Sequence, residues 1–385
     1  MKKINLSIPN LSGEEKKYLT ECIDTGMVSS VGNFVNIFEN RLKNFTKSKN
    51  AICCNSGTSS IHLGLRLLRV SQEDEVIVPT MSFIATANCV KYLNANPIFM
   101  DCDNFYNLDV KKTLKFINEE TYFKKGFSFN KKTKKKIKAL IIVHALGNAA
   151  NIESILNICK KKNIKILEDA AGALGTKFKK GKLKGKHVGT IGDVGCISFN
   201  GNKIITTGAG GVLLTNNSKL AHEAKYLSTT AIDDKLNYRH DEIGYNYRLS
   251  NVHSAIGIAQ LKKLNFFLKR KKFFHRFYKS SLKKNSFFSY DDKPAYALNN
   301  NWMLSMRFKK ISKHKKQQLI KYLNINNIEA RSVWTPLHLQ KKYKQYQRYE
   351  ISNAIIMFNS SINLPSSTNL KIEDLKKVVK LLNNF

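Results

Sequence analysis

Three short segments carry residue types that could do chemistry, and the first is the hydroxyl-rich turn NSGTSS at 55–60. It lies between an apolar run and an amphipathic segment, so it stands at the start of a predicted helix. Free backbone N–H groups, hydroxyl donors and the helix dipole at such a place favour a phosphate group. Simple helix capping by the same residues is the alternative.

The second segment is the apolar strand pattern IKILED at 164–169, which ends in Glu168 and Asp169 and runs into the small residues AAGALG. A carboxylate at the end of a buried strand lies where cofactors bind in α/β proteins. Asp169 could ligate magnesium, hold a ribose or pair with a protonated pyridine nitrogen. A helix N-cap aspartate is the alternative, and the segment alone leaves these choices open.

The third segment is SFNGNKIITTGAGG at 198–211, which places Lys203 after an apolar strand and before a glycine-rich turn. Lys203 is one of 55 lysines, so its type alone says little. Its context is different, because small neighbours leave room for a ring and burial lowers the pKa of an amine toward nucleophilic competence. The glycines 208, 210 and 211 also suit an ordinary tight turn.

The order of the three segments is more specific than any one of them. A phosphate-binding turn, a strand-end Asp169 and, 34 residues later, Lys203 form the layout of fold-type-I pyridoxal-phosphate enzymes. In that chemistry the lysine forms a Schiff base and the carboxylate keeps the pyridine nitrogen protonated, so that the ring accepts electrons. The combination predicts pyridoxal 5′-phosphate as cofactor, with Lys203 as the catalytic residue.

A sheet is needed to bring these three segments together, and the sequence pattern of residues 51–215 predicts one. Short apolar runs alternate there with helical stretches such as 59–69 and 152–162. Such alternation predicts the α/β class, with a mainly parallel sheet covered by helices and ligands at the carboxyl ends of its strands. The seven expected strands are 51–54, 75–79, 97–101, 139–144, 164–169, 195–200 and 211–215.

The rest of the chain predicts a second, smaller unit. Residues 250–284 form a long basic helical stretch, and two further helices are expected near 312–326 and 372–383. We therefore divide the chain into a large cofactor-binding domain at 1–250 and a long helix with a small C-terminal α/β domain at 251–385. The segment 122–138 is interpreted as a loop insertion in the large domain.

Composition narrows the class of protein. The chain has 385 residues and a net charge of +37, but only 10 of its 65 basic residues are arginine, and the lysines are spread along the chain. Nucleic-acid readers favour clustered arginine, so we interpret the charge as a solvated surface. A polyanion-binding protein stays the alternative from another class, suggested by KKTKKKIK at 131–138.

The cysteines and the apolar runs point to a cytoplasmic protein. Seven scattered cysteines form no CxxC pair, which indicates reduced thiols and no structural zinc, and we expect no metal. No apolar run approaches the roughly 18 residues of a membrane span. The start MKKINLSIPN lacks the continuous apolar stretch of a signal peptide.

The sequence also resembles the DegT/StrS-type sugar-nucleotide aminotransferases over almost its whole length. The segments that carry the resemblance are VSSVGNFVNIFE, NSGTSSIHLGL, DEVIVPTMSFIATAN, ILEDAAGALGT, GDVGCISFNGNKIITTGAGG, EIGYNYRLSNVHSAIGIAQL and ARSVWTPLHLQ. Within that family SFNGNKIITTG and WTPLHLQ are most similar to the branch of legionaminic-acid-type and related 4-amino-sugar pathways. The resemblance implies the fold-type-I aminotransferase architecture.

The resemblance also implies a role for each matching residue. Lys203 binds the cofactor aldehyde, Asp169 contacts the pyridine nitrogen, and Phe83 stacks on the ring. Asn246 in GYNYRLS reaches the phosphate of the neighbouring subunit, which implies a homodimer with shared active sites. Gly57, Thr58 and Ser198 hold the phosphate, and Ser29, Ser30 and His338 fall in segments that line the sugar-nucleotide site.

Two positions depart from the family pattern. Gly172 stands where relatives usually carry Gln, Glu or His, which puts the choice of substrate in question, and Ala209 changes the usual glycine-rich run slightly. The retained Lys203 favours transamination, because related dehydratases carry His there. The expected reaction moves an amino group, from glutamate by resemblance, to the 4-keto group of a nucleotide-linked 6-deoxy sugar.

We expect UDP-2-acetamido-2,6-dideoxy-4-hexulose as the acceptor. The alternatives are a GDP-perosamine-type acceptor, a 3-keto sugar, or an enzyme that keeps Lys203 but has lost activity through Gly172.

Overall fold

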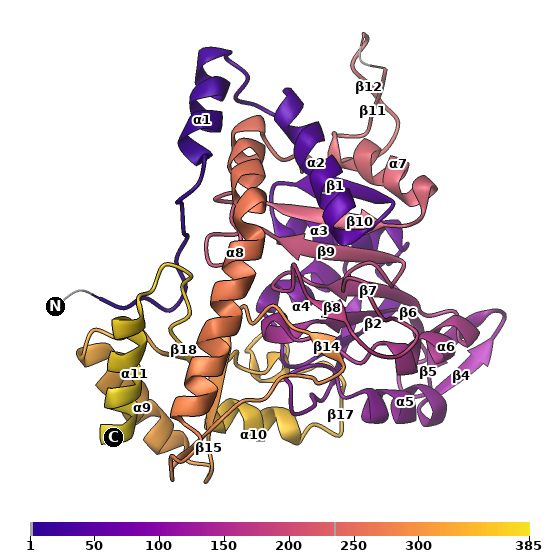
Figure 1. Ribbon diagram of the computed structural model, residues 1–385. Helices are drawn as coiled ribbons and strands as arrows, with labels where there is room; N and C mark the ends of the chain where they lie inside the picture. The colour runs from indigo at the N-terminus through magenta and orange to yellow at the C-terminus, as the bar shows by residue number, and fades with distance from the viewer. Residues whose placement is uncertain (1–2, 235) are drawn as a thin grey trace.

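A computed structural model describes residues 3–234 and 236–385, and its centre is one large sheet (Figure 1). The seven strands expected from the sequence are all present and adjacent, in the order β1-β10-β9-β7-β6-β2-β3. Their bounds are β1 (Asn50–Cys54), β2 (Asp74–Pro79), β3 (Asn96–Met100), β6 (Lys136–Val143), β7 (Lys165–Asp169), β9 (Val194–Ser198) and β10 (Gly211–Thr215).

The sheet is mainly parallel, as predicted. Strands β9, β7, β6, β2 and β3 run parallel to one another. Strand β10 runs antiparallel to both β9 and β1. Since parallel strands end at the same edge, the residues after β7 and β9 meet there.

Three further strands extend this sheet beyond the seven. The short β17 (Arg348–Tyr349), from the C-terminal part of the chain, pairs in parallel with β3. Strands β4 (Thr121–Lys124) and β5 (Phe127–Asn130) form a hairpin, and β5 pairs with β6. The interpretation of 122–138 as a loop was wrong, because alternating aromatic residues there form an antiparallel ladder.

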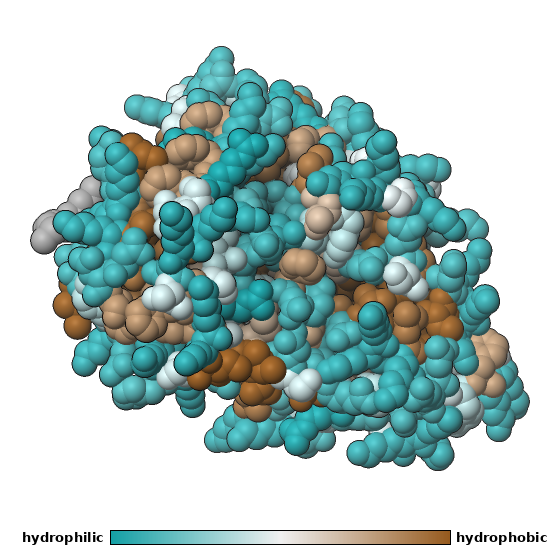
Figure 2. Space-filling view, turned by 60° about the horizontal axis from the view of Figure 1, so that its bottom comes forward, coloured by the Kyte–Doolittle hydropathy of each residue, from teal (hydrophilic) through white to brown (hydrophobic). Residues whose placement is uncertain are grey.

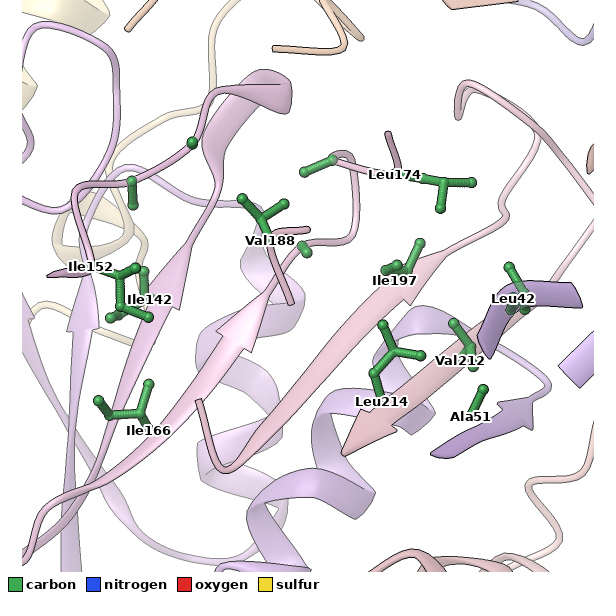
Figure 3. Packing of buried hydrophobic residues seen from close by; sticks show 14 of the residues in the cluster. Leu42, Ala51, Ile142, Ile152, Ile166, Leu174, Val188, Ile197, Val212 and Leu214 are labelled. Carbon is green, nitrogen blue, oxygen red and sulfur yellow. The ribbon is translucent and has the colours of Figure 1, made fainter. Parts of the chain in front are cut away.

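Helices cover both faces of the sheet because alternate strand residues point to opposite sides. Ile142 and Leu214 belong to one buried cluster with Leu42 of α2, and Figure 3 shows this cluster spread across the strands, from Ile142 on one side to Leu42 on the other. Ile141 and Leu213 belong to the cluster on the other face. The helices of this part are α1 (Glu15–Asp24), α2 (Asn33–Thr46), α3 (Gly57–Leu67), α4 (Ile84–Tyr92), α5 (Val110–Glu119), α6 (Glu153–Lys161), α7 (Ser218–Ser228) and a 3₁₀ turn η1 (Ala145–Gly147).

A long helix, α8 (Asn251–Ser281), joins the large sheet to a second, smaller one and runs through the middle of Figure 1. Its residue Phe267 packs in the core of the large sheet, and Phe274 and Tyr278 pack in a separate core. That second core lies on an antiparallel sheet of order β13-β15-β18-β16.

The remaining elements are the four strands of this smaller sheet and the segments that surround it or lie on the surface. They are β8 (Lys177–Phe178), β11 (Ile232–Asp234), β12 (Arg239–His240), β13 (Phe288–Tyr290), β14 (Ala297–Leu298), β15 (Leu304–Phe308), α9 (Lys313–Ile325), β16 (Arg331–Ser332), η2 (Leu337–Leu339), α10 (Asn353–Ser360), β18 (Ser361–Leu364) and α11 (Ile372–Asn384). The helices expected near 312–326 and 372–383 are therefore α9 and α11.

The face of the molecule shown in Figure 2 is mostly hydrophilic. On the face shown in Figure 2, hydrophobic residues form separate small groups among hydrophilic ones. In the basic run 131–138, Lys136 pairs with Asp74 at 3.1 Å and lies 5.1 Å from the ring of Phe127. Across residues 3–234 and 236–385, no helix has the length and apolar character that crossing a membrane requires.

Candidate active site

A cavity of about 500 Å³ opens at the carboxyl edge of the parallel strands. Loops and helix ends that follow the strands form most of its wall, and the smaller C-terminal sheet and its connections close another side. Six residues singled out from the sequence line this one cavity: Gly57, Thr58, Phe83, Asp169, Ser198 and Lys203.

One end of the cavity is the start of α3. Ser56 caps the helix by accepting a hydrogen bond from the Ser59 N–H at 3.0 Å. Gly57 then lies against Ser198 at the end of β9, and a Cβ on Gly57 would approach the Ser198 Cβ to 2.7 Å. A glycine is needed there for helix and strand to meet, and the meeting puts a hydroxyl beside N–H groups that lack partners within the helix. This end suits a phosphate.

Asp169 is held in place at the end of β7. The Thr86 hydroxyl donates to Asp169 Oδ2 at 2.8 Å and the Ala171 N–H donates to Oδ1 at 3.1 Å. Ser82 Oγ lies 2.8 Å from the same Thr86 oxygen. The carboxylate is 5% exposed and belongs to the cavity wall, so its orientation is fixed before any ligand arrives.

The neighbouring carboxylate, Glu168, has a different environment because adjacent strand residues point to opposite faces. Its oxygens accept from the N–H groups of Gly189 at 2.8 Å and Gly192 at 2.7 Å, and lie 2.9 Å from His144 Nε2. Burial alone would raise the pKa of Glu168, but His144 and these N–H groups bring it below its usual value. Glu168 therefore ties the loop after β8 to β7.

Lys203 lies half-buried at the turn after β9, with its Nζ 3.7 Å from the ring centre of Trp302. Burial lowers the pKa of this amine to about 8, and the negative charge of Asp169 opposes that shift. A larger fraction of the amine is therefore neutral near pH 7 than for an exposed lysine, and a neutral amine is the nucleophilic form.

The hydroxyl-rich turn, the fixed carboxylate and the half-buried lysine thus share one cavity, and the match to a known family agrees with the chemistry expected of them. The profile of the DegT/DnrJ/EryC1/StrS aminotransferase family matches residues 9–383. The chain belongs to this family. It is a pyridoxal-phosphate-dependent sugar aminotransferase with the fold-type-I architecture.

Individual relatives cover the whole aminotransferase. GDP-perosamine synthase of Escherichia coli O157:H7 is 35% identical over 386 residues, covering 100% of this chain and 99% of the relative. The putative pyridoxal phosphate-dependent aminotransferase EpsN of Bacillus subtilis is 33% identical, covering 99% and 95%. The structure of Helicobacter pylori PseC, an aminotransferase involved in the biosynthesis of pseudoaminic acid, gives a TM-score of 0.89 at 25% identity, covering 100% and 99%.

The side chains of the cavity fit pyridoxal phosphate. The start of α3 with Ser198 suits the phosphate, Asp169 suits a protonated pyridine nitrogen, and the Lys203 amine suits the aldehyde. Phe83 caps the start of α4 with a ring that is 59% exposed, which leaves its face free to stack. In the described part of the chain, no group of three or more Cys, His, Asp or Glu is arranged to hold a metal ion.

Four residues carried over by resemblance lie elsewhere. Asn246 is exposed and outside the cavity, where its backbone C=O accepts from Asn55 Nδ2 at 3.1 Å. Ser29 is exposed and Ser30 half-buried, and neither lines the cavity. His338 is 4% exposed in η2, with Nδ1 2.6 Å from Thr80 Oγ1 after β2, so it also lies outside the cavity wall.

The residues that sequence reasoning missed come mainly from the C-terminal part. Trp302, Met303 and Trp334 line the cavity, as do Arg331 and Asn363, which are paired residues of the smaller sheet. Trp302 and Trp334 have ring centres 6.4 Å apart. Two signals were available: the chain has only two tryptophans, and Arg331 and Trp334 lie in the segment ARSVWTPLHLQ, which carries the family resemblance.

Proposed function

We propose that this aminotransferase moves an amino group from glutamate to the 4-keto group of a nucleotide-linked 6-deoxy sugar, through pyridoxal phosphate bound to Lys203. The observation that carries the proposal is the convergence of Gly57, Ser198, Asp169 and Lys203 on one cavity. Their order along the chain and their chemistry match the three ends of this cofactor, its phosphate, its pyridine nitrogen and its aldehyde.

Each residue has a separate task in the proposed reaction. When bound, the cofactor supplies an electron-accepting ring that stabilises negative charge on a substrate carbon. Asp169, held by Thr86 and the Ala171 N–H, keeps a proton on the ring nitrogen. The Lys203 amine takes the proton from the donor's Cα and returns one on the acceptor side, because its lowered pKa suits both directions near neutral pH.

The curated relatives favour a GDP-linked acceptor. Proteins named GDP-perosamine synthase are 35% and 33% identical to this chain over nearly its full length. We infer that a GDP-linked 4-keto-6-deoxy hexose is the first acceptor to test. We expect Arg331, which lies at the cavity wall with a side chain that is 72% exposed and 2.6 Å from Glu329 Oε1, to contact the diphosphate.

The second candidate acceptor is UDP-2-acetamido-2,6-dideoxy-4-hexulose. The segment SFNGNKIITTG favours it, by its likeness to the legionaminic-type branch. A UDP-4-amino-4,6-dideoxy-N-acetyl-β-L-altrosamine transaminase of Campylobacter jejuni is also similar, at 29% identity. Both candidate acceptors carry a 4-keto group. They differ in the nucleotide and in the substituent at C2.

Two measurements test the proposal. Glutamate added to the purified, yellow protein should bleach its visible band and release 2-oxoglutarate, and a later keto-sugar should restore the band. A panel of GDP- and UDP-linked 4-keto and 3-keto sugars, read by mass, should show amination of a 4-keto sugar only. Amination of a 3-keto sugar alone, or no spectral response to glutamate, would contradict the proposal.

We further propose a homodimer in which Asn246, Ser29 and Ser30 complete the partner's site. Their position outside their own cavity supports this, together with the exposed apolar side chains of Met27, Val28 and Val31 beside the two serines.

A mixing experiment tests whether Asn246 completes the site of the partner chain or that of its own chain. Inactive Lys203→Ala and weakened Asn246→Ala chains, unfolded and refolded together, should regain about a quarter of the wild-type turnover, since half of the dimers are mixed and each mixed dimer has one intact site. If Asn246 served its own chain, mixing would restore nothing. Light scattering of the unmixed proteins checks that both remain dimers.

We place this reaction in the cytoplasm, where its nucleotide-linked substrates are expected. All seven cysteines are free and buried, which agrees with a reducing compartment. The rival function, polyanion binding through 131–138, predicts binding to DNA that weakens steeply with salt and does not depend on the cofactor.

A further inference from the structure

The backbone of Gly172 and the indole ring of Trp302 lie so close together that no side chain at position 172 fits beside the ring. Gly172 lies in the buried turn that follows β7. A Cβ on Gly172 would lie 2.1 Å from Cε3 and 2.5 Å from Cζ3 of Trp302. Both distances are far below van der Waals contact, so the indole ring occupies the space that any side chain at position 172 needs.

The indole ring has little freedom to move away, because hydrogen bonds hold Trp302 at every polar atom. Its N–H donates to Asn300 Oδ1 at 2.9 Å, and Nε1–H donates to the Asn202 C=O at 2.7 Å. Its C=O accepts from Lys271 Nζ at 2.8 Å. Asn300 also donates to the Gly172 C=O at 2.8 Å, which fixes the two partners relative to each other.

The same indole ring also contacts Lys203. The Lys203 Nζ lies 3.7 Å from the ring centre, within the range of a cation–π contact. The Nε1 hydrogen bond goes to Asn202, the residue before Lys203, so Trp302 contacts both the backbone and the amine of this turn. The ring therefore connects the turn after β7 to the turn that carries the lysine.

We propose that Trp302 is a positioning residue for Lys203, and that it replaces the polar side chain expected at position 172 as the wall of the cavity beside the lysine. The proposal rests on Lys203 being the cofactor lysine. It explains how the enzyme keeps its activity with a glycine at position 172. The indole forms the cavity wall that a side chain at 172 would otherwise form, and its ring face orients the Lys203 amine that lies over it.

A set of five variants tests whether the two positions are matched. Gly172→Gln restores a side chain of the expected type, Trp302→Ala removes the ring, and the double variant does both. Gly172→Ala adds only the Cβ, and Trp302→Phe keeps a ring without Nε1. Each is compared with wild type in melting temperature, in affinity for pyridoxal phosphate, and in the rate of Lys203 acylation in cofactor-free protein, read by peptide mass.

Gly172→Gln and Trp302→Ala should each change the affinity for pyridoxal phosphate and the acylation rate of Lys203 by about tenfold, whereas the double variant should return to within about threefold of wild type. Trp302→Phe should lie between wild type and Trp302→Ala, since it keeps the ring face. If Gly172→Gln fails to fold, Gly172→Ala carries the same test, because its Cβ meets the same ring carbons.

Two results would overturn the proposal. One is a Gly172→Gln protein with wild-type affinity and acylation, and the other is a double variant whose loss is the sum of the single losses. A failure of the proposed function looks different: the wild-type protein would bind no pyridoxal phosphate, while the acylation rates would still report whether Trp302 positions the amine.

Discussion

Two lysines contact the same tryptophan, yet only one of them faces the cavity. Lys203 Nζ lies over the ring of Trp302, whereas Lys271 Nζ, on α8, donates to the Trp302 C=O. Burial lowers the pKa of both amines, to about 8 for Lys203 and to about 7 for Lys271, where the charge of Lys293 adds to the effect. By pKa alone, Lys271 is the better nucleophile.

The difference between them lies in access and in hydrogen bonding. Lys271 is 2% exposed and donates to Ser366 Oγ at 2.9 Å as well as to the Trp302 C=O, so its donors are used for structure. Lys203 is half-buried, lines the cavity and lies against the face of a ring. A lowered pKa therefore marks buried lysines in general, and an open path to an electrophile distinguishes the reactive one.

The largest expected effect is that of Lys203→Ala. Removing the amine takes away both the cofactor's attachment point and the proton carrier, so turnover should fall to background and the yellow colour should be lost. Absorbance and the release of 2-oxoglutarate measure the two effects. Lys271→Met is the matched control, since it removes a buried amine beside the same tryptophan and should keep the colour.

Loss of colour in Lys271→Met, with colour retained in Lys203→Ala, would reverse the assignment of the two lysines. A melting temperature for each variant excludes unfolding as the cause.

The next effect is that of Asp169→Asn, which keeps the size of the side chain but removes its charge. Without a carboxylate the ring nitrogen no longer holds a proton, so turnover should fall by about a hundredfold or more while pyridoxal phosphate still binds. The charge of Asp169 raises the pKa of Lys203, so its removal should also lower that pKa below about 8.

The pH dependence of Lys203 acylation in cofactor-free protein reports this second effect. A midpoint that stays constant or rises would show that Asp169 does not act on the amine. Thr86→Val offers a milder control, because it removes one hydrogen bond to Asp169 but leaves the charge in place.

Local pattern was enough to predict the large sheet and one side of the site. The seven strands alternate with helices at short range, and each of Gly57, Asp169, Ser198 and Lys203 follows or ends a strand, so the parallel topology brings them to one edge. Strand alternation also separates Asp169, in the cavity, from Glu168, which binds N–H groups of the loop after β8.

The other side of the site depends on contacts far apart in the chain. Trp302 contacts Gly172 from 130 residues away and Lys203 from 99 residues away, because α8 carries the smaller sheet back against the cavity. No local pattern encodes that contact. Pairing of β17 with β3 is likewise invisible in a two-residue strand, and it places a segment from 251–385 in the large sheet.

The smallest expected effect is that of Lys271→Met, which should change stability rather than chemistry. The pKa of Lys271 is about 7 in the folded protein and 10.5 in an unfolded chain. Between these pH values the unfolded chain binds more protons at this group than the folded protein does, so the free energy of unfolding of the wild type rises with pH. Below about pH 7 the destabilisation caused by burying this amine has its full size. Methionine has no such dependence.

The prediction therefore concerns how the difference in stability between Lys271→Met and wild type changes with pH. The loss of two hydrogen bonds lowers the free energy of unfolding of Lys271→Met by an amount that does not depend on pH. The difference in free energy of unfolding between variant and wild type should nevertheless shift in favour of the wild type by about 1–4 kcal/mol between about pH 7 and about pH 10. Denaturant unfolding at both values measures the difference. A difference that does not change with pH would mean that Lys271 keeps its proton when folded, and the two lysines would then differ in charge as well as in access.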